Sequence, residues 1–598
     1  MTEIKSTIKE QNATQQHGAL DTVHSTSLHQ NNSSATANAK KHLKKQTSAF
    51  DNIAFHLGIK KTDNDQVDDR NLFVTLLQLL AYFCVPIIAD TGFMTPKSAQ
   101  GQRVLGVLVI LFIASVTGFF VMWFTDVYDN SLLENLKLSY NSTAAEWWEK
   151  PPVNPLLKVH IFNYTNIEDF FSGKAEKLKV VDLGPYVYHE TAEKVNVSYH
   201  KNGTISYKEL RSYQFLANQS SGMQYDKVVV PNIPMITAIS QSSDESIFKK
   251  MLLNTALSGV DAKAFKVLPV DLFLWGYEDE LLKLAKKFSF DSEMPFSKFG
   301  ILMTRNGTSS ETFTIYSGEK DLKQLAIIKD LNGKSSLDIW TTDECNRVDG
   351  TDGSQFPPHL MDKRQTLYVF IKSLCRKFPL RYEKEVTLFD GIPAWRYKAP
   401  TDVFAHPSIN ADNQCFCHLG SASCPLSGLL NATLCSYGAP IYASFPHYYT
   451  GDKKLLEMVE GLDPQREKHE TFADIHPRLA FPIDGASRFQ INIEVKKASY
   501  ISGLEPFKDG QILPVIWLEV VPGYISEELR NMIYHSTFSA NAIQFSFKYG
   551  SLLICVTTFA LLAMTCYFRT KNADDINDDE PEDQPTMKLN SISSEIRS

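Results

Sequence analysis

The chain has 598 residues, of which 43% are hydrophobic and 11% aromatic, so it can bury a sizeable core and shows no general sign of disorder. Its net charge of -8 comes from 60 basic and 68 acidic residues, which leaves no basic field that would concentrate a polyanion. We therefore expect no nucleic-acid partner.

The N-terminal segment, residues 1–103, is predicted to be a largely disordered cytoplasmic tail. Its first 70 residues are rich in Ser, Thr, Asn, Gln, His and Lys, and no stretch among them keeps an apolar period long enough to bury. Residues 72–89 are mostly apolar but are interrupted by Gln78 and Pro86. That segment stays open as an interfacial or re-entrant element or as a third membrane span.

Two further segments are apolar enough to cross a bilayer. Residues 104–124 run for 21 positions without a charge, and residues 550–568 are nearly as apolar over 19 positions. As helices rising about 1.5 Å per residue, they match a hydrocarbon core roughly 30 Å thick. A pair of buried core helices is the alternative. The first segment begins too deep in the chain and is too long for a cleaved signal peptide, so we expect an uncleaved anchor.

Charged residues beside the two spans indicate their orientation. Lys97 and Arg103 precede the first span, and Arg569 and Lys571 follow the second. Because Lys and Arg next to a span stay preferentially on the cytoplasmic side, both termini are predicted to be cytoplasmic. Residues 125–549 then form an ectodomain, outside the cell or in the lumen of a vesicle. The acidic segment 569–598 is predicted to be a second, solvated tail.

The ectodomain carries signals for both strands and helices. Leu157, Val159 and Ile161 alternate with polar residues, and residues 488–496 show the same period of two, which is typical of half-buried strands. In the second segment the predicted buried face is Phe489, Ile491, Ile493 and Val495, and the predicted exposed face is Gln490, Asn492 and Glu494. No regular strand-helix alternation demands a parallel sheet, so an α+β fold with antiparallel strands is favoured.

A helix is predicted after a capping box made by Ser242 and Glu245. The apolar residues that follow recur at helical spacing and would form its buried stripe: Ile247, Phe248, Met251, Leu252, Thr255 and Ala256.

Glycosylation signals are numerous in the predicted ectodomain. Seven sequons of the type N-x-S/T occur there, at Asn141, Asn163, Asn196, Asn202, Asn218, Asn306 and Asn431. Such triplets also arise by chance, as the sequons Asn12, Asn31 and Asn32 in the N-terminal tail illustrate. The seven are predicted acceptors in a translocated domain.

Six of the nine cysteines lie close together in the ectodomain: Cys345, Cys375, Cys415, Cys417, Cys424 and Cys435. An even, clustered set in an oxidising compartment predicts three disulfides, although spacing alone leaves fifteen pairings open. A zinc site is the alternative, but the paired C-x2-C arrangement typical of zinc ligands is missing. We expect no metal.

Two catalytic patterns occur in the sequence, and both are incomplete. The pair His469 and Glu470 lacks the second histidine, four positions after His469, that a zinc protease needs. Residues 484–487 form a single Asp-Gly turn of the kind that membrane ecto-nucleotidases use to hold phosphate, without the second Gly-rich loop such enzymes require. No enzymatic activity and no cofactor are predicted.

Several motifs make the chain similar to the class B scavenger receptors, the family of platelet glycoprotein IV and the type two lysosomal integral membrane protein. The motifs are GTDGSQFPP (350–358), CFC (415–417), GAPIYASFPHYYTGD (438–452) and DIHPRLAFPIDGASRFQIN (474–492). Shorter matches are IFNYTN (161–166), LGPYVYHE (183–190), LWGY (274–277) and LPVIWLE (513–519), so the resemblance covers nearly all of residues 104–568.

The resemblance implies an antiparallel β-barrel-like core and a helical bundle at the membrane-distal apex, near residues 233–263. It also implies a pairing for the cysteines: Cys345 with Cys415, Cys375 with Cys435, and Cys417 with Cys424. An apical lysine that helps some relatives to bind acidic ligands falls at Gly259, so Lys263 is the nearest substitute.

The resemblance also implies a function and a set of partners. Relatives bind lipids, fatty acids or lipoprotein-like particles at the apex, and a tunnel is thought to pass lipid to the phospholipid membrane. Apoptotic cells and microbes are further partners of such receptors. We expect a plasma-membrane scavenger-type receptor, because the acidic dileucine signal of the lysosomal branch is missing. The alternatives are a lysosomal or endosomal location, a sorting or engulfment receptor without lipid transport, and an ecto-hydrolase.

Overall fold

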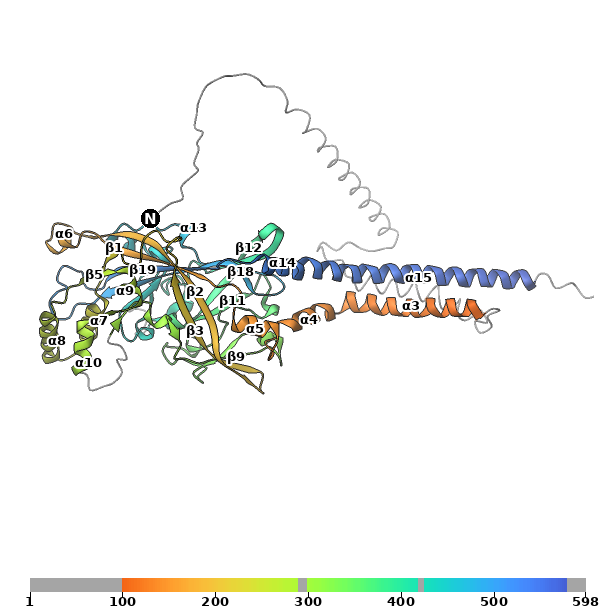
Figure 1. Ribbon diagram of the computed structural model, residues 1–598, viewed down its shortest axis with the longest axis horizontal. Coiled ribbons are helices and arrows are strands. Elements are labelled where there is room, and N and C mark those ends of the chain that lie inside the picture. Colours follow the sequence, from red (N-terminus) through yellow and green to blue (C-terminus); the bar gives the residue numbers. More distant parts are fainter. Residues whose placement is uncertain (1–98, 289–297, 418–423, 578–598) are drawn as a thin grey trace, which may run out of the picture. The chain divides into compact units, whose positions relative to one another are not determined.

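The computed structural model describes residues 99–288, 298–417 and 424–577 (Figure 1). The chain divides into two compact units, and the description below concerns the larger of them, Val109–Phe559, together with the outer ends of two long helices that extend beyond it. Residues 72–89, most of the N-terminal tail and the end of the C-terminal tail lie outside the described residues.

Two long helices flank the folded domain, α3 (Ala99–Phe124) and α15 (Ala540–Asn577). Both are long and apolar enough to cross a membrane. The Trp123 indole N–H donates to the carbonyl oxygen of Lys548 over 3.1 Å, so the helices run side by side where they leave the domain. The prediction of two apolar helices around one large domain is confirmed.

The domain is built on one sheet of fifteen strands, in which all neighbours pair antiparallel except β2 and β16. Eleven strands follow one path: β10 (Ile328–Leu331), β9 (Phe313–Tyr316), β3 (Thr204–Phe215), β2 (Leu178–His200), β1 (Leu156–Tyr164), β19 (Gln511–Val521), β18 (Pro482–Val495), β17 (Phe472–Ile475), β13 (Ile392–Lys398), β12 (Arg376–Leu388) and β11 (Thr366–Ile371). The other four are β8 (Gly307–Thr308), β14 (Leu430–Asn431), β15 (Ile441–Ser444) and β16 (Val459–Glu460).

Short helices and two small ribbons surround this sheet. The ribbons pair β4 (Lys227–Pro231) with β5 (Phe265–Pro269), and β6 (Tyr277–Glu278) with β7 (Lys298–Phe299). The helices are α4 (Val127–Leu133), α5 (Thr143–Glu149), α6 (Ile167–Phe171), α7 (Ile233–Gln241), α8 (Ile247–Gly259), α9 (Val270–Trp275), α10 (Glu280–Phe288), α11 (Asp343–Asn346), α12 (Lys453–Leu456), α13 (Arg466–His469) and α14 (Glu527–Tyr534). The α+β class with an antiparallel sheet is confirmed.

The two edges of the sheet nearly meet. The N–H of Ile328 in β10 donates to the carbonyl oxygen of Gly350 over 2.8 Å, and Thr351 exchanges hydrogen bonds with β11 through Tyr368 and Phe370. Unpaired backbone groups at a sheet edge invite aggregation. The short segment 350–351 gives both edges partners and nearly closes the sheet into a barrel.

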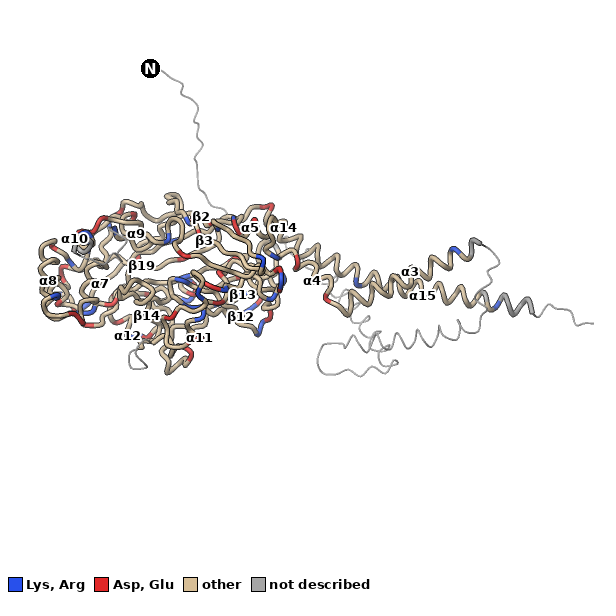
Figure 2. Tube along the Cα trace, turned by 90° about the horizontal axis from the view of Figure 1, so that it is seen from below, with Lys and Arg blue, Asp and Glu red and all other residues tan. Residues whose placement is uncertain are grey.

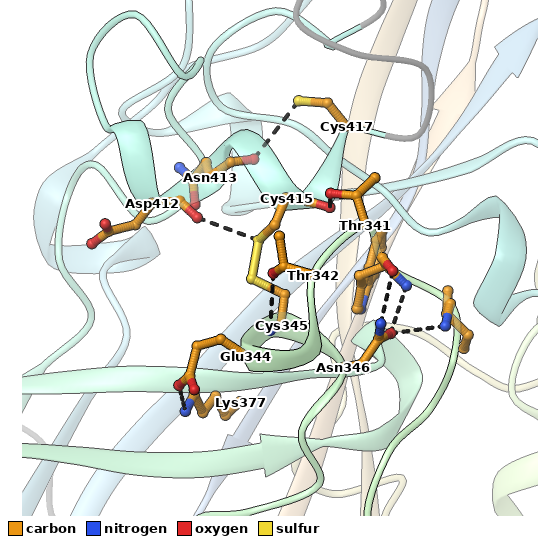
Figure 3. Close-up of a disulfide and its surroundings, with 12 residues drawn as sticks. Thr341, Thr342, Glu344, Cys345, Asn346, Lys377, Asp412, Asn413, Cys415 and Cys417 are labelled. Atoms are coloured by element: carbon orange, nitrogen blue, oxygen red, sulfur yellow. Dashed lines mark hydrogen bonds and ion pairs between the residues drawn. A yellow bond between two sulfur atoms is a disulfide. The ribbon is translucent and has the colours of Figure 1, made fainter.

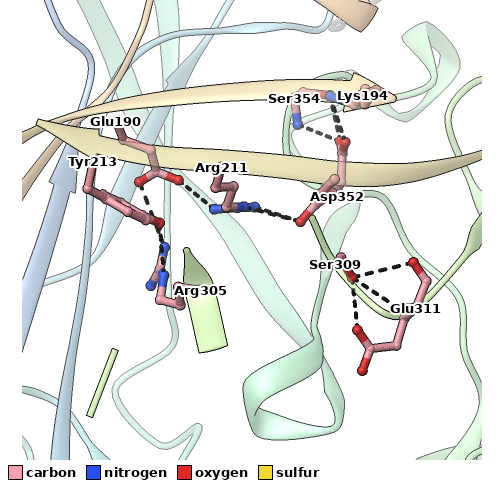
Figure 4. A network of polar contacts seen from close by, with 10 residues as sticks. Glu190, Lys194, Arg211, Tyr213, Arg305, Ser309, Glu311, Asp352 and Ser354 are labelled. Atoms are coloured by element: carbon pink, nitrogen blue, oxygen red, sulfur yellow. Dashed lines mark hydrogen bonds and ion pairs between the residues drawn. The ribbon is translucent and has the colours of Figure 1, made fainter. Parts of the chain in front are cut away.

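Ion pairs hold this bridging segment against β2 (Figure 4). The carboxylate of Asp352 lies 3.5 Å from the Lys194 ammonium. Burial alone would raise the pKa of Asp352, but the charge of Lys194 lowers it below its ordinary value. Further along β2, the buried Glu190 pairs with Arg211 at 2.7 Å and Arg305 at 3.8 Å. Charged partners therefore satisfy the buried carboxylates next to the closure.

The largest apolar core includes the inward faces of the central strands. Leu157, Val159 and Ile161 are completely buried in β1, so the alternation predicted for that strand is confirmed.

The strand predicted over residues 488–496 exists within β18. Its predicted buried face is confirmed at Ile493 and Val495, which are completely buried, and is wrong before the register shift between Ile491 and Asn492. Gln490 and Asn492 are completely buried, whereas Phe489 and Ile491 are half-buried. The amides are satisfied internally, since Gln490 accepts the His447 N–H over 2.6 Å and donates to Asn492 over 2.7 Å. A fully hydrogen-bonded polar row can be buried without the usual desolvation penalty.

All six ectodomain cysteines form disulfides in the structure: Cys345–Cys415, Cys375–Cys435 and Cys417–Cys424. These are the pairs that the family resemblance implied, and bonded sulfurs are not available to zinc. Figure 3 shows the first bridge, next to which the backbone N–H of Cys345 donates to the hydroxyl oxygen of Thr342, the N-cap of α11. The bridge attaches the segment before Gly350 to the segment before Cys417.

We predict that replacing Gly350, in the segment that bridges the two sheet edges, destabilises the protein. Its φ of +87° is unfavourable for other residues, and a Cβ there would lie 2.8 Å from the carbonyl oxygen of Tyr368. Gly350→Ala should destabilise the protein by about 2–4 kcal/mol, from a left-handed backbone and a steric clash. Denaturant unfolding of the full chain in detergent measures the loss.

Gly333 supplies the matched control. Its φ is +79°, yet no atom lies within 4 Å of its added Cβ. Gly333→Ala should cost only the conformational part, about 1–2 kcal/mol. If both variants lose the same free energy of unfolding, the close contact between position 350 and Tyr368 does not contribute to stability.

Candidate ligand-binding apex

Helices α7, α8 and α10 gather at the end of the domain that is remote from α5 and α14 (Figure 1). The capping box predicted at Ser242 and Glu245, between α7 and α8, is not present. Ser242 is the C-cap of α7, where its hydroxyl donates to the Ile239 carbonyl oxygen over 2.7 Å, so it lies too far before α8 to cap that helix. Helix α8 starts after Ser246 instead.

The apolar stripe of α8 faces solvent, which corrects the prediction that it is buried. Phe248 is 76% exposed and Leu252 is 61% exposed, and Ile247 and Met251 are also more than half exposed. The side of α8 that faces the domain instead buries Lys250, whose ammonium donates to the Ser243 carbonyl oxygen over 2.7 Å. A row of exposed apolar side chains on one helix is typical of a binding surface. We call these four residues the α8 patch.

A cavity of about 240 Å³ opens beside the helices of the apex. Its lining includes the apolar residues Ile239, Ala498, Ile501 and Leu504, together with Lys497 and Glu505. Pockets that enclose a drug-sized ligand measure ~300–1,000 Å³, so this cavity suits part of a chain-like apolar ligand.

The loop that lines the cavity is fastened to the apical helices. Both the N–H and the hydroxyl of Ser502 donate to the Asn254 side-chain oxygen of α8, over 3.0 and 2.9 Å. The Lys497 ammonium donates to the Glu505 carbonyl oxygen over 2.8 Å, which places a cation at the rim without a carboxylate partner among the described residues. The α8 patch and the cavity are thus parts of one connected apex.

Charge at the apex is balanced, and Figure 2 shows both signs around α7, α8 and α10. Three acidic and three basic residues occur between positions 242 and 263. Lys249 pairs with Glu245 at 2.8 Å, and Lys263 lies 3.6 Å from Asp261. Lys263 is exposed on the loop after α8, outside the cavity lining. The apex therefore presents apolar surface rather than a cationic field.

A second group of polar residues lies inside the barrel around Asp182. This carboxylate accepts hydrogen bonds from His447 and Trp517, each over 3.0 Å, and lies 3.3 Å from His160. Burial alone would raise the pKa of Asp182, but the hydrogen bonds from His160 and His447 lower it well below its ordinary value. The arrangement joins β1, β2 and β19 to the loop before Tyr448.

This histidine-aspartate pair lacks the free nitrogen of a general base. The Nδ1 of His447 accepts the Asp463 N–H over 3.1 Å, so both ring nitrogens are occupied. The prediction of an Asp-Gly turn at residues 484–487 is also wrong. These residues belong to strand β18, which pairs with β17 there. A β-strand aims no cluster of N–H groups at a phosphate.

The predicted glycosylation sites fall into two groups. Asn163 and Asn431 are half-buried, and their amides bond to the Val229 N–H at 2.8 Å and to the Tyr442 hydroxyl at 3.2 Å. The remaining five are exposed: Asn141, Asn196, Asn202, Asn218 and Asn306.

Sequence reasoning missed the residues that make the cavity. Ile239, Lys497 and Leu504 come from two distant segments, and no spacing in the chain brings them together. The exposed α8 patch had a sequence signal, its helical period, but that period does not say which side of the helix packs on the domain.

The fold and the site together define a class: membrane proteins that hold one disulfide-bonded antiparallel domain between two apolar helices. The family model named CD36 family matches residues 104–566. Scavenger receptor class B member 1 of Sus scrofa is 32% identical over 425 residues, which are 70% of this chain and 81% of that protein. Lysosome membrane protein 2 of Homo sapiens is 37% identical over 391 residues, 65% of this chain and 79% of that protein.

The chain belongs to the CD36 family. The resemblance found from the motifs is thereby confirmed. The matched relatives are named as a scavenger receptor and a lysosomal membrane protein.

Two buried histidines predict that the domain loses stability in acid. Burial, reinforced by the charge of His447, lowers the pKa of His469 to about 3, and burial with Arg478 lowers that of His476 to about 4. In the unfolded chain both titrate near ~6.5. Between these values the unfolded state binds one more proton per histidine, so the free energy of unfolding falls by about 1.4 kcal/mol per pH unit and histidine as pH decreases.

Replacing one of these histidines should flatten the pH profile. We expect His469→Gln to remove about 1.4 kcal/mol per pH unit from the slope between pH 6 and pH 5, measured by denaturant unfolding. The exposed His200→Gln is the control and should leave the slope unchanged. A wild-type slope in the His469 variant would show that this residue is protonated in the folded state.

Proposed function

We propose that this protein is a scavenger-type cell-surface receptor that binds lipids or lipid-bearing particles at its apex. The observation that carries the proposal is the α8 patch, four apolar side chains that are each more than half exposed. The chain's membership of the CD36 family supports the same function, because a relative is named as a scavenger receptor.

The energetics of the α8 patch favour an apolar ligand. Fully burying a Leu or Phe side chain contributes about 1.5–3 kcal/mol, so covering Phe248 and Leu252 supplies enough free energy for a useful contact. The pairing of Lys249 and Lys263 with acidic neighbours leaves little net charge for an anionic surface. Lipids, fatty acids and lipoprotein-like particles fit this chemistry, and lipid-exposing microbes or apoptotic cells fit it as partners.

The apical cavity suggests how bound lipid is taken up. An acyl chain that moves from a particle into the cavity avoids water, at about 0.8 kcal/mol for each buried methylene. We propose that lipid then passes through the domain to the phospholipid membrane, down its own gradient. Neither a cofactor nor an enzymatic step is needed for this transfer.

A receptor that takes up lipid is the first candidate, and a sorting or engulfment receptor without lipid transport is the second. A relative named lysosome membrane protein 2 supports the second candidate, a sorting or engulfment receptor with an endosomal or lysosomal location. An ecto-hydrolase is the third and least supported candidate, since His447 has no free nitrogen.

Removing two side chains of the α8 patch tests the proposal. Phe248→Ser combined with Leu252→Ser should weaken binding of fluorescent phospholipid particles to cells that make the full chain by roughly thirtyfold, which corresponds to about 2 kcal/mol of lost apolar contact. Both side chains are exposed, so surface expression should be unaffected.

The control is Ser258→Ala, which changes an exposed polar residue of the same helix and should bind normally. If cells that make the unaltered chain bind particles but take up no fluorescent fatty acid, the sorting or engulfment receptor is favoured. Nucleotide hydrolysis by the purified full chain would instead favour the ecto-hydrolase. Unchanged binding by the double variant contradicts the assignment of the apex.

The proposed topology places both termini in the cytoplasm at the plasma membrane. Protease added to intact cells should cut within residues 125–549 and spare epitope tags at either terminus, because Lys and Arg flank the spans on the tagged sides. Permeabilised cells are the control, in which the tags should be removed as well. Loss of a tag from intact cells would invert the topology.

A further inference from the structure

An arginine without a counterion lies beneath the disulfide-bonded region. Arg376 begins β12, directly after Cys375, and only 6% of its surface is exposed. It forms no ion pair or side-chain hydrogen bond with any residue that the structure describes, and its Nε is buried without a partner. Residues 418–423, which the structure does not describe, contain no Asp or Glu in the sequence.

Other buried or half-buried arginines of the barrel are neutralised. Arg211, Arg396 and Arg488 each pair with a carboxylate, at 2.7, 2.6 and 2.6 Å. For Arg376 the described residues offer only the ring of Phe416, whose centre lies 3.8 Å from the guanidinium carbon. A cation over a desolvated ring gains about 2 kcal/mol, whereas burying an unpaired charge costs several kcal/mol.

The guanidinium nevertheless stays charged at neutral pH. Burial lowers the pKa of Arg376 to about 9, which is still well above 7. The described side chains therefore leave this cation without a negatively charged partner.

A small cavity adjoins Arg376 and offers the space. Its volume is about 20 Å³, and Phe404, Asn413, Phe416 and His406 are among its lining residues. A site for one water needs ~10–15 Å³ by this measure, so the cavity accepts one water-sized particle. No carboxylate lines it.

Two polar side chains of the lining are donors or are already occupied. His406 accepts the Ser408 N–H at Nδ1 over 3.2 Å, so its hydrogen resides on Nε2 and can be donated. The amide nitrogen of Asn413 is used by the carbonyl oxygens of Asp402 and Ala405, at 3.2 and 2.7 Å. A positive guanidinium and an imidazole N–H thus border a space of ionic size.

We propose that the cavity beside Arg376 is a binding site for a small monovalent inorganic anion of the size of chloride, held by the Arg376 guanidinium. The anion neutralises the buried cation and thereby stabilises the region where all three disulfides lie. The site is separate from the apex, so it can fail or succeed independently of the proposed receptor function.

Anion-dependent stability provides the first test. The full chain in detergent is unfolded by heat in sodium chloride and in sodium gluconate at equal ionic strength. Chloride should raise the unfolding temperature saturably by about 1–2 °C, because a ligand that binds only the folded state stabilises it. Arg376→Gln should abolish the difference, and Arg381→Gln, an exposed arginine of the same strand, should retain it.

Anomalous diffraction provides a second test that needs no variant. Crystals of the full chain soaked in sodium bromide should show an anomalous peak within hydrogen-bonding distance of the Arg376 guanidinium. Absence of that peak means that the cavity holds only water and overturns the proposal. A peak without any chloride-dependent stability also overturns it, since the ion then binds at crystal concentration only.

Discussion

The barrel depends on backbone hydrogen bonds made by two residues. Strands β10 and β11 are the edges of a large sheet, and their outward N–H and C=O groups need partners. Segment 350–351 supplies them, through Ile328 on one side and Tyr368 and Phe370 on the other. This segment lies on the same connection that joins the two edge strands in sequence, so one stretch of chain links them both along the backbone and across the gap.

Several other features make sense as supports for this closure. Lys194 and Asp352 hold the bridging segment to β2, and Cys345 attaches the beginning of the same connection to Cys415. Inside the barrel, Asp182 gathers groups from three strands and from the loop that contains His447. Polar contacts therefore supplement the apolar core in holding these strands together.

The sequence predicts well those features that depend on length and composition. Two apolar helices, an antiparallel sheet and the paired state of the cysteines follow from such signals, and the family motifs add the cysteine partners. Binary patterning failed over residues 489–492 of β18 and at α8 for one reason. Burial of a side chain depends on where its partners are, and Gln490 and Lys250 find theirs inside the protein. No local pattern reveals that Phe248 and Leu252 have none, or that the cation of Arg376 lacks a carboxylate.

The side-by-side helices α3 and α15 also affect the unfolded chain. Tyr128 donates to the Ala540 carbonyl oxygen over 2.9 Å, so the domain starts and ends at neighbouring points. With both helices held in one bilayer, the unfolded domain remains a closed loop of several hundred residues. Closing a loop of this length removes conformational entropy worth about 6 kcal/mol in the chain-entropy model. A bilayer that holds both helices acts as a crosslink, so we expect the domain to be more stable when anchored than when excised.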